Sequence, residues 1–260
     1  MSPMGFSNEL GLEGELHREI AGRGLPLLLL HGFGGTHSDF EHLLELTRWS
    51  ERYQLIAPDL RGHGRSSPLT SPLTQRACAE DVLRLLDQLS IERIAAIGVS
   101  MGGNTLLHVA KRAPERVSSM ILVSATSHFP EQARVVMRAA GSASHDEAEW
   151  AAMRARHLGG DAQIRALFAQ PLAFAANYDD MSFGPGELRE IRTRTLLVVG
   201  ERDPLYPLDV SLELWRGIPD ARLWVVPGAG HTPVFAENRP EFERIAWNFL
   251  GADETATERE

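Results

Sequence analysis

The chain has 260 residues, 43% of them hydrophobic and 23% charged, which is the balance of a folded globular protein with a substantial core. This composition excludes a disordered chain, a collagen-like repeat and a disulfide-stabilised miniprotein. The formal net charge of −9 argues against a surface that binds nucleic acid and against a polybasic membrane-surface segment.

The cysteine content and the N-terminal region predict the cellular setting. Cys78 is the single cysteine, so no intrachain disulfide can form and nothing requires an oxidising compartment. The first twenty residues have no basic stretch followed by an apolar one, and the apolar run at 25–30 is too short to span a bilayer. We therefore expect a cytoplasmic monomer or homodimer that acts on a small molecule and binds neither nucleic acid nor membrane.

Six apolar runs predict the strands of a parallel sheet. They are apolar nearly throughout, which is typical of strands buried on both faces. These runs are Pro26–His31, Tyr53–Pro58, Ile94–Val99, Val117–Ser124, Thr195–Gly200 and Ala221–Val226. Weaker signals at Leu10–Leu12 and Glu15–Ile20 predict an antiparallel hairpin at one edge.

Amphipathic segments between these runs predict helices. The alternation of strand and helix indicates right-handed crossovers and an α/β fold with a doubly wound, mostly parallel sheet. The predicted helices are Asp39–Trp49, Gln75–Leu89, Met101–Ala113, Leu208–Arg216 and Glu241–Leu250.

The alternation breaks once, between about Ser127 and Leu188, where alanine is frequent and no strand is evident. We predict a helical insertion at residues 127–188, within an α/β core formed by residues 1–126 and 189–250. The small, polar and acidic residues 251–260 predict a flexible C-terminal tail.

The strongest chemical signal is the sequence GVSMGG at 98–103, between an apolar strand and a helix. A serine on such a tight strand-to-helix turn stands clear of the sheet beside a helix N-terminus, which favours developing negative charge. Ser100 is therefore the predicted nucleophile. Acyl transfer also needs two N–H donors for the oxyanion, and we predict the backbone N–H of Met101 and that of Phe33, in the glycine-rich loop HGFGG.

A serine nucleophile needs a base and a carboxylate that orients the base. His231 ends the sequence VVPGAGH after a predicted strand, where the ligand crevice of a parallel sheet forms, and we predict it as the base. Asp203 and Glu201 both follow the strand that ends at Gly200, and Asp203 is favoured because Pro204 restricts its backbone. His31 is expected to form hydrogen bonds within its loop.

The sequence DLRGHGRS at 59–66 lies before Ser100 and breaks the expected order of a triad. We interpret it as a structural loop in which Asp59 pairs with Arg61. Cys78 is expected in the core, and no Cys/His cluster has the spacing of a metal site, so we predict no metal.

The motifs HGFGG, PDLRGHGRS, GVSMGG, GERDPLYP and GAGHTPVF together resemble the α/β-hydrolase superfamily across the chain outside the insertion. The resemblance implies an eight-stranded, mostly parallel sheet, a cap formed by residues 127–188, and Ser100, Asp203 and His231 as a catalytic triad. Six residues are predicted to contact the substrate: Phe33, Met101, Phe129, Trp150, Phe168 and Phe174. Leu167 and Tyr178 are further candidates in the cap.

Departures from individual subfamilies narrow the reaction. Haloalkane dehalogenases and epoxide hydrolases carry aspartate in place of Ser100, and proline iminopeptidases usually carry tryptophan in place of Met101. Carbon–carbon hydrolases of the meta-cleavage type usually have tryptophan where Thr232 stands, and the menaquinone-pathway synthase usually has arginine in place of Asn104.

The subfamilies that remain are carboxylesterases, enol-lactone hydrolases and haloperoxidase-like esterases. Resemblance to them predicts a cofactor-free serine hydrolase that acts on a small carboxylic ester or lactone. Two alternatives stay open: a carbon–carbon hydrolase or lyase on the same triad, and a ligand sensor with an intact triad.

Overall fold

The computed structural model describes residues 15–251, which form one seven-stranded sheet in the order β1-β3-β2-β4-β5-β6-β7. All neighbouring strands are parallel except β1, which pairs antiparallel with β3. The strands are β1 (Arg18–Ala21), β2 (Leu25–Leu30), β3 (Tyr53–Pro58), β4 (Ile94–Val99), β5 (Val117–Val123), β6 (Arg194–Gly200) and β7 (Ala221–Val226).

The mostly parallel doubly wound sheet is confirmed, but the expected count of eight strands is wrong for this part of the chain, which has seven. The N-terminal hairpin partner at Leu10–Leu12 lies outside the described residues. The edge strand β1 pairs with β3, where Ile20 lies opposite Ile56. Residues 252–260, predicted as a tail, also lie outside the described part.

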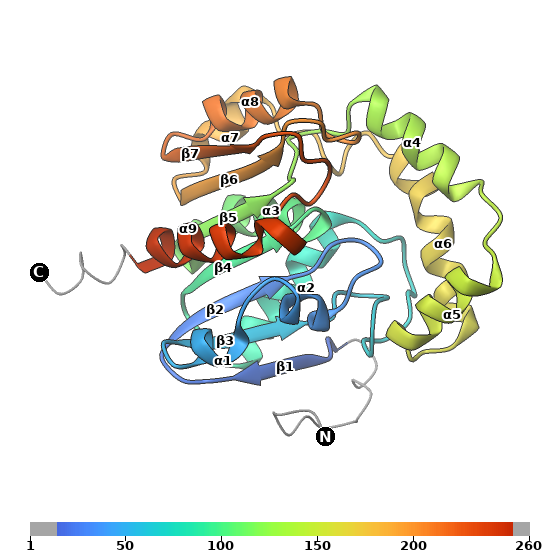
Figure 1. The fold of residues 1–260 in the computed structure, drawn as a ribbon, viewed down its shortest axis with the longest axis horizontal. Helices are drawn as coiled ribbons and strands as arrows, with labels where there is room; N and C mark the ends of the chain where they lie inside the picture. Colours follow the sequence, from blue (N-terminus) through green and yellow to red (C-terminus); the bar gives the residue numbers. More distant parts are fainter. Residues whose placement is uncertain (1–14, 252–260) are drawn as a thin grey trace, which may run out of the picture.

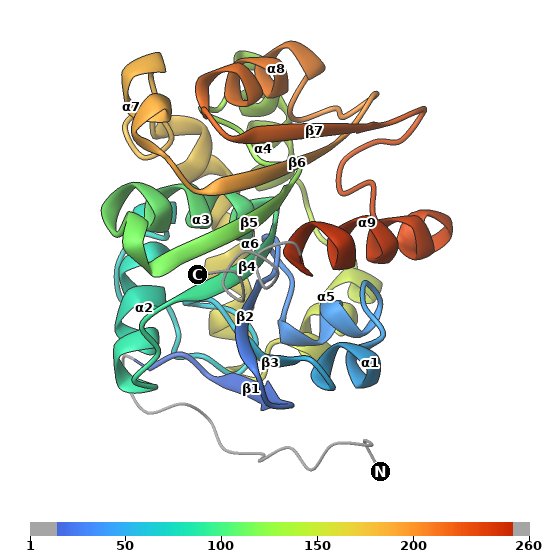
Figure 2. The ribbon, with the colours of Figure 1, turned by 90° about the vertical axis from the view of Figure 1, so that its left-hand side faces the viewer.

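The inner strands β2 and β4 are apolar throughout because both faces of the sheet are covered. In β2, Leu28 and Leu30 join one hydrophobic core while Leu27 and Leu29 join the other, as side chains alternate along a strand. Figure 2 shows the two helical layers on either side of the sheet. One layer contains α2 (Gln75–Gln88), α3 (Met101–Arg112), α7 (Pro185–Glu190) and α8 (Leu208–Gly217), and the other α1 (Leu46–Ser50) and α9 (Arg239–Gly251).

The predicted single helix Asp39–Trp49 is wrong. The structure has a 3-10 turn, η1 (His37–Glu41), and then the short helix α1. Leu43 and Leu44 lie in the break and are fully buried against the sheet. A continuous helix would keep its turns evenly spaced, so the break places two adjacent leucines in the core.

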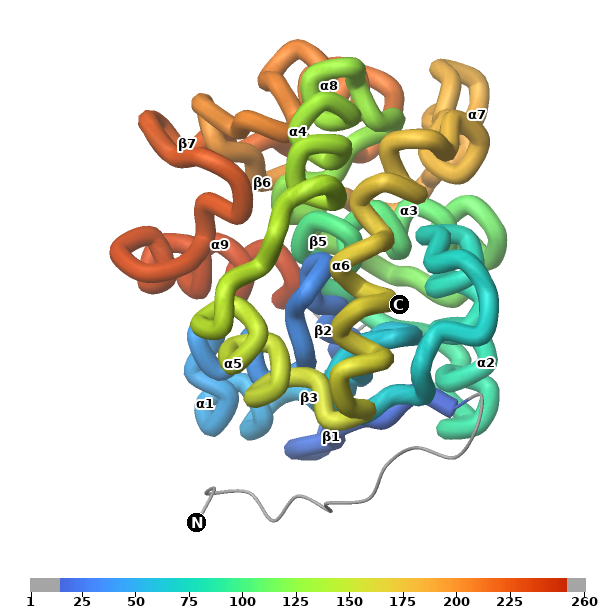
Figure 3. Tube along the Cα trace, turned by 90° about the vertical axis from the view of Figure 1, so that its right-hand side faces the viewer, coloured from blue at the N-terminus to red at the C-terminus, as the bar shows by residue number. Residues whose placement is uncertain are grey.

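The insertion contains α4 (Glu131–Gly141), α5 (Glu147–Arg156) and α6 (Asp161–Ala176), and we call residues 128–182 the cap. A backbone bridge between His128 and Ser182 closes its base, so the chain leaves and re-enters the core at one place. Figure 1 shows these helices as an arc beside the sheet, and Figure 3 shows them in front of it from that side. The helix α7 begins at Pro185, within the predicted insertion, and packs against α8 of the core.

Among the described residues, no helix combines the length and the apolar character that crossing a bilayer requires.

Candidate active site

Ser100 lies between β4 and α3 with a φ of 51°, a left-handed conformation that is rare for a residue with a side chain. The turn is possible because the residues two positions before and after Ser100 are glycines. A Cβ on Gly98 would lie 2.6 Å from the Gly102 backbone, and one on Gly102 would lie 2.1 Å from the carbonyl oxygen of Leu30. The glycines therefore allow the strand, the helix and β2 to meet at the serine.

The structure brings the three predicted catalytic side chains together. His231 Nε2 lies 2.9 Å from Ser100 Oγ, and His231 Nδ1 lies 2.7 Å from Asp203 Oδ2. The three residues follow β4, β6 and β7, whose carboxyl ends meet at one edge of the sheet. Contacts this short are the geometry that proton transfer from a serine hydroxyl requires.

The surroundings of Asp203 keep its carboxylate ionised. Burial favours the neutral acid, but the hydrogen bond and charge of His231 and the backbone N–H groups of Tyr206 and Leu205 lower the pKa overall. Those two N–H groups donate to Oδ1 at 3.0 and 2.8 Å, which leaves Oδ2 for the imidazole. An ionised Asp203 holds the proton of His231 on Nδ1, so Nε2 presents its lone pair to Ser100.

The competing carboxylate, Glu201, has a different role. Its Oε2 accepts the backbone N–H of Gly228 at 2.7 Å. Ser124 directly follows β5, and its hydroxyl accepts the N–H of Thr232 at 3.0 Å. Both side chains thus fix the loop that carries His231.

Both predicted oxyanion donors belong to segments near Ser100: Met101 follows it in the chain, and a Cβ on Gly32, the residue before Phe33, would lie 3.6 Å from Ser100 Cβ. Within the described residues, no hydrogen bond uses the backbone N–H of Phe33 or that of Met101. The loop of Phe33 is held by His31, which accepts the Leu60 N–H at 2.9 Å and donates to the Gly32 carbonyl at 2.7 Å. The expectation that His31 forms hydrogen bonds within its loop is confirmed.

The loop at 59–66 is structural, but its predicted ion pair is wrong. Arg61 binds Asp81 of α2, with Nη2 2.7 Å from Oδ1. Asp59 is fully buried and accepts the backbone N–H groups of His37 and Arg65 at 2.8 and 2.9 Å. A carboxylate held by local N–H donors satisfies the backbone where the chain turns, which an ion pair with Arg61 would not do.

His63 in this loop supports the oxyanion loop, a role that sequence reasoning missed. Its Nε2 accepts the N–H of Gly34 at 3.1 Å and its Nδ1 donates to the Arg61 carbonyl at 3.0 Å. Burial holds the pKa of His63 well below its usual range, so the ring stays neutral and can accept. The signal in the sequence was the histidine between two glycines.

A row of aromatic rings runs from the triad to the cap. The Tyr206 ring lies 5.3 Å from that of His231, and Phe129 lies 6.4 Å from Tyr206. Phe174 of α6 packs edge-on against Phe33 at 5.5 Å. Sequence reasoning missed Tyr206, which adjoins the predicted acid and is buried.

The other predicted cap residues lie elsewhere. The rings of Trp150 and Phe168 pack 5.3 Å apart between α5 and α6, and Phe168 stacks on His145. Leu167 is fully buried, whereas Tyr178 is 62% exposed beneath the guanidinium of Arg134. These contacts are within the cap, so the structure places only Phe129 and Phe174 in the row of rings beside the triad.

A cavity of about 190 Å³ opens beside the oxyanion loop. Arg156 of α5 reaches its lining and forms an ion pair with Asp39 of the core. The rest of the lining includes Phe33, Val99, Thr232 and Phe235. The cap and the core therefore both contribute to the wall of this cavity.

A group of side chains close enough to share a metal ion lies elsewhere in the described part of the chain. His17, Glu19 and His37 bring their ligand atoms together near the start of β1. The sequence showed no such spacing because the residues come from two separate segments.

Comparison with known proteins identifies the family. Residues 26–142 match the model of the alpha/beta hydrolase fold. The chain is 30% identical to a 2-hydroxymuconate semialdehyde hydrolase of Pseudomonas putida, over 92% of this chain and 91% of that protein. The chain belongs to the α/β-hydrolase superfamily.

Two further relatives of this α/β hydrolase are informative. A putative carbamate hydrolase RutD of Azorhizobium caulinodans is 30% identical over 93% of this chain and 97% of that protein. The fold is also that of a meta-cleavage product hydrolase from Pseudomonas fluorescens IP01, with a TM-score of 0.74, 21% identity, and coverage of 92% of this chain and 94% of that one. The two sequence relatives are named for different substrates, a semialdehyde and a carbamate.

Proposed function

We propose that this α/β hydrolase is a serine hydrolase that cleaves a small carboxylic ester or lactone through an acyl-enzyme intermediate. The observation that carries the proposal is the continuous contact from Ser100 Oγ through His231 to Asp203, at 2.9 and 2.7 Å. A serine hydroxyl so placed has a base to remove its proton and a carboxylate to hold that base.

In the proposed mechanism, Ser100 Oγ attacks the substrate carbonyl while His231 Nε2 takes its proton. The oxyanion of the tetrahedral intermediate accepts the N–H groups of Phe33 and Met101, which have no partner among the described residues. His231 then protonates the leaving alcohol, and the acyl group stays on Ser100. A water that gives its proton to His231 hydrolyses the acyl-enzyme and restores the serine.

The small size of the proposed substrate rests on the resemblance to carboxylesterases and enol-lactone hydrolases, because no triad residue lines the cavity of about 190 Å³ beside the oxyanion loop. The proposed reaction uses only protein groups and water, so we propose that it needs no metal and no cofactor.

We further propose a cytoplasmic monomer or homodimer, because neither the mechanism nor the acidic charge calls for a membrane or nucleic-acid partner.

The second candidate function is carbon–carbon bond hydrolysis, because a relative with 30% identity over most of the chain is a 2-hydroxymuconate semialdehyde hydrolase. Thr232 supports the ester proposal instead, since the meta-cleavage family usually has tryptophan at this position. Thr232 directly follows the proposed base in the chain, and its N–H is fixed by Ser124.

A fluorophosphonate probe followed by a substrate panel tests the proposal. We expect the probe to label Ser100 and the panel of chromogenic esters and lactones to be turned over faster than a meta-cleavage ring-opened dienoate. Labelling with preferential dienoate turnover would establish the second candidate. Slow turnover of every substrate, with a melting temperature that rises with ligand, would indicate a sensor.

A further inference from the structure

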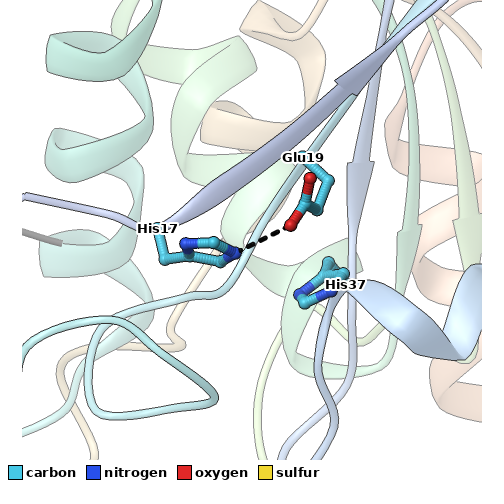
Figure 4. Close-up of side chains that lie close together, drawn as sticks. All are labelled: His17, Glu19 and His37. Carbon is cyan, nitrogen blue, oxygen red and sulfur yellow. Dashed lines mark hydrogen bonds and ion pairs between the residues drawn. The ribbon is translucent and has the colours of Figure 1, made fainter. Parts of the chain in front are cut away.

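The residues His17, Glu19 and His37 form a compact group at the edge of the sheet. His17 directly precedes β1 and Glu19 lies within it, two positions apart and therefore on one side of the strand. His17 Nε2 lies 3.2 Å from Glu19 Oε1, and His37 enters from the start of η1. One ligand atom of each residue lies within 4.8 Å of the other two. Figure 4 shows the three side chains gathered around a common space.

Asp59 orients the third member of this group. His37 Nδ1 lies 2.8 Å from Asp59 Oδ1, and the fully buried carboxylate also accepts the His37 backbone N–H. This contact places the ring proton on Nδ1 and leaves Nε2 as the nitrogen with a free lone pair. A carboxylate behind a histidine in this way is the usual support of a metal-binding imidazole.

We propose that His17, Glu19 and His37 bind one divalent transition-metal ion, with Zn²⁺ as the representative ion. Two imidazole nitrogens and one carboxylate oxygen suit Zn²⁺ better than Mg²⁺ or Ca²⁺, which prefer oxygen ligands. Tetrahedral Zn²⁺ holds its donors about 3.4 Å apart. The His17–Glu19 pair already has this separation, and the His37 ring needs a shift on the order of 1 Å.

The charge next to the group bears on its affinity. Arg65 Nη1 lies 3.6 Å from Glu19 Oε1, and its positive charge opposes a bound cation. The contact is partly exposed and long, so we expect it to be exchanged when a metal binds. Removing this charge should therefore strengthen binding.

The site is separate from the catalytic centre. In the sheet, β3 and β2 lie between β1 and β4, the strand that leads to Ser100. A metal bound here would cross-link the edge strand β1 to η1, the 3-10 turn that follows the oxyanion loop. It would stabilise the fold without entering the reaction.

The test is calorimetric titration of the full chain with ZnCl₂ in a non-chelating buffer, together with thermal unfolding. We expect one ion per chain and a rise in melting temperature that EDTA reverses, while the rate of ester hydrolysis stays unchanged. His17→Ala, His37→Ala and Glu19→Gln should each weaken binding by at least about tenfold. Arg65→Gln should strengthen it. His42→Ala, which removes an exposed imidazole from the same segment, is the matched control and should bind as the wild type does.

Several results would overturn the proposal. These are the absence of stoichiometric binding to the wild type, equal binding by the His17 and His37 variants, and inhibition of ester hydrolysis by the same ion. X-ray absorption of the zinc-loaded wild type keeps the test decisive should a variant fail to fold. We expect two imidazoles among the ligands, and any other number contradicts the site.

Discussion

The loops of the core and the helices of the cap hold their functional side chains in different ways. In the core, hydrogen bonds with backbone N–H groups fix the triad and its loops. Asp203 accepts two such N–H groups. The Ser124 hydroxyl accepts the N–H of Thr232, the residue after His231. In the cap, the aromatic residues of α5 and α6 pack mainly on one another, and Leu158 and Leu172 are exposed. The difference teaches that hydrogen bonds fix the proposed catalytic residues, whereas packing between rings holds the cap residues that we propose to select the substrate.

Removing the proposed nucleophile is the strongest test of whether the core carries the chemistry. Ser100→Ala should lower kcat for esters by about 10⁴- to 10⁶-fold, as should His231→Ala, because the triad acts as a unit. Ester hydrolysis and fluorophosphonate labelling measure the loss, and circular dichroism checks the fold. Ser118→Ala is the matched control, since its hydroxyl binds the Ile94 carbonyl at the far end of the neighbouring strand. More than a tenth of wild-type activity in Ser100→Ala would refute the assignment of the nucleophile.

The orienting carboxylate should give the next largest effect. Asp203→Asn should lower kcat by roughly 10⁴-fold because the amide favours the wrong imidazole tautomer. Glu201→Gln is the control: it retains an oxygen that can accept the Gly228 N–H, so we expect less than about a tenfold loss. A larger loss in Glu201→Gln than in Asp203→Asn would exchange the two roles.

Selectivity should respond to the cap where its rings meet the core. Phe174→Ala removes the ring packed on Phe33, and we expect it to shift the preference between short and long acyl chains by about 1–3 kcal/mol. Trp150→Ala is the matched control, because its ring packs on Phe168 within the cap. It should lower the melting temperature and leave the ratio of kcat/KM values unchanged. If both variants slow all esters equally, the cap does not select the substrate.

A smaller, pH-dependent effect concerns the contact that ties the cap to the core. His157 follows α5, is buried, and accepts the Gly64 N–H on Nδ1 at 2.8 Å. Burial lowers its pKa from 6.5 to about 4, so between these values the unfolded chain binds a proton that the folded chain does not. The free energy of unfolding should therefore fall as the pH drops from about 6.5 towards 4, by about 2 kcal/mol at pH 5 from this group.

Denaturant unfolding at pH 7 and pH 5 measures this contribution. Asn at position 157 can accept the same N–H without titrating, so His157→Asn should lose about 2 kcal/mol less than the wild type between the two values. The buried His63 retains its own contribution in both proteins. An identical loss in both proteins would show that His157 titrates normally in the folded chain.

The sequence predicted the structure best where a local pattern of residues is compatible with one kind of backbone structure. The apolar runs predicted β3, β4 and β7 with the bounds that the structure has, because nearly continuous apolar runs are typical of strands in a parallel sheet. Ser100 could be singled out because the glycines around it are required for close approach.

Partners distant in the chain could not be predicted in this way. Arg61 binds Asp81 instead of Asp59, and His17 meets His37, because such pairs depend on how the loops pack and leave no spacing to read. The cap could also be predicted only in part. Its alanine-rich sequence predicted a helical insertion, but not which of its aromatic rings would pack against Phe33. Local rules therefore predicted the sheet and the elbow, and tertiary packing decided the rest.

The pairing of β5 with β6 has a consequence for how such a protein can change over time. The two strands are neighbours in the sheet, with Val123 opposite Val198, although the whole cap separates them in the chain. Closing a flexible loop costs free energy only logarithmically with its length, about 0.6 kcal/mol for each doubling. Since the bridge between His128 and Ser182 already joins the two ends of the cap, the segment between them could lengthen, shrink or be exchanged at little cost to the sheet. A lineage could in this way replace the substrate it accepts while inheriting its nucleophile unchanged.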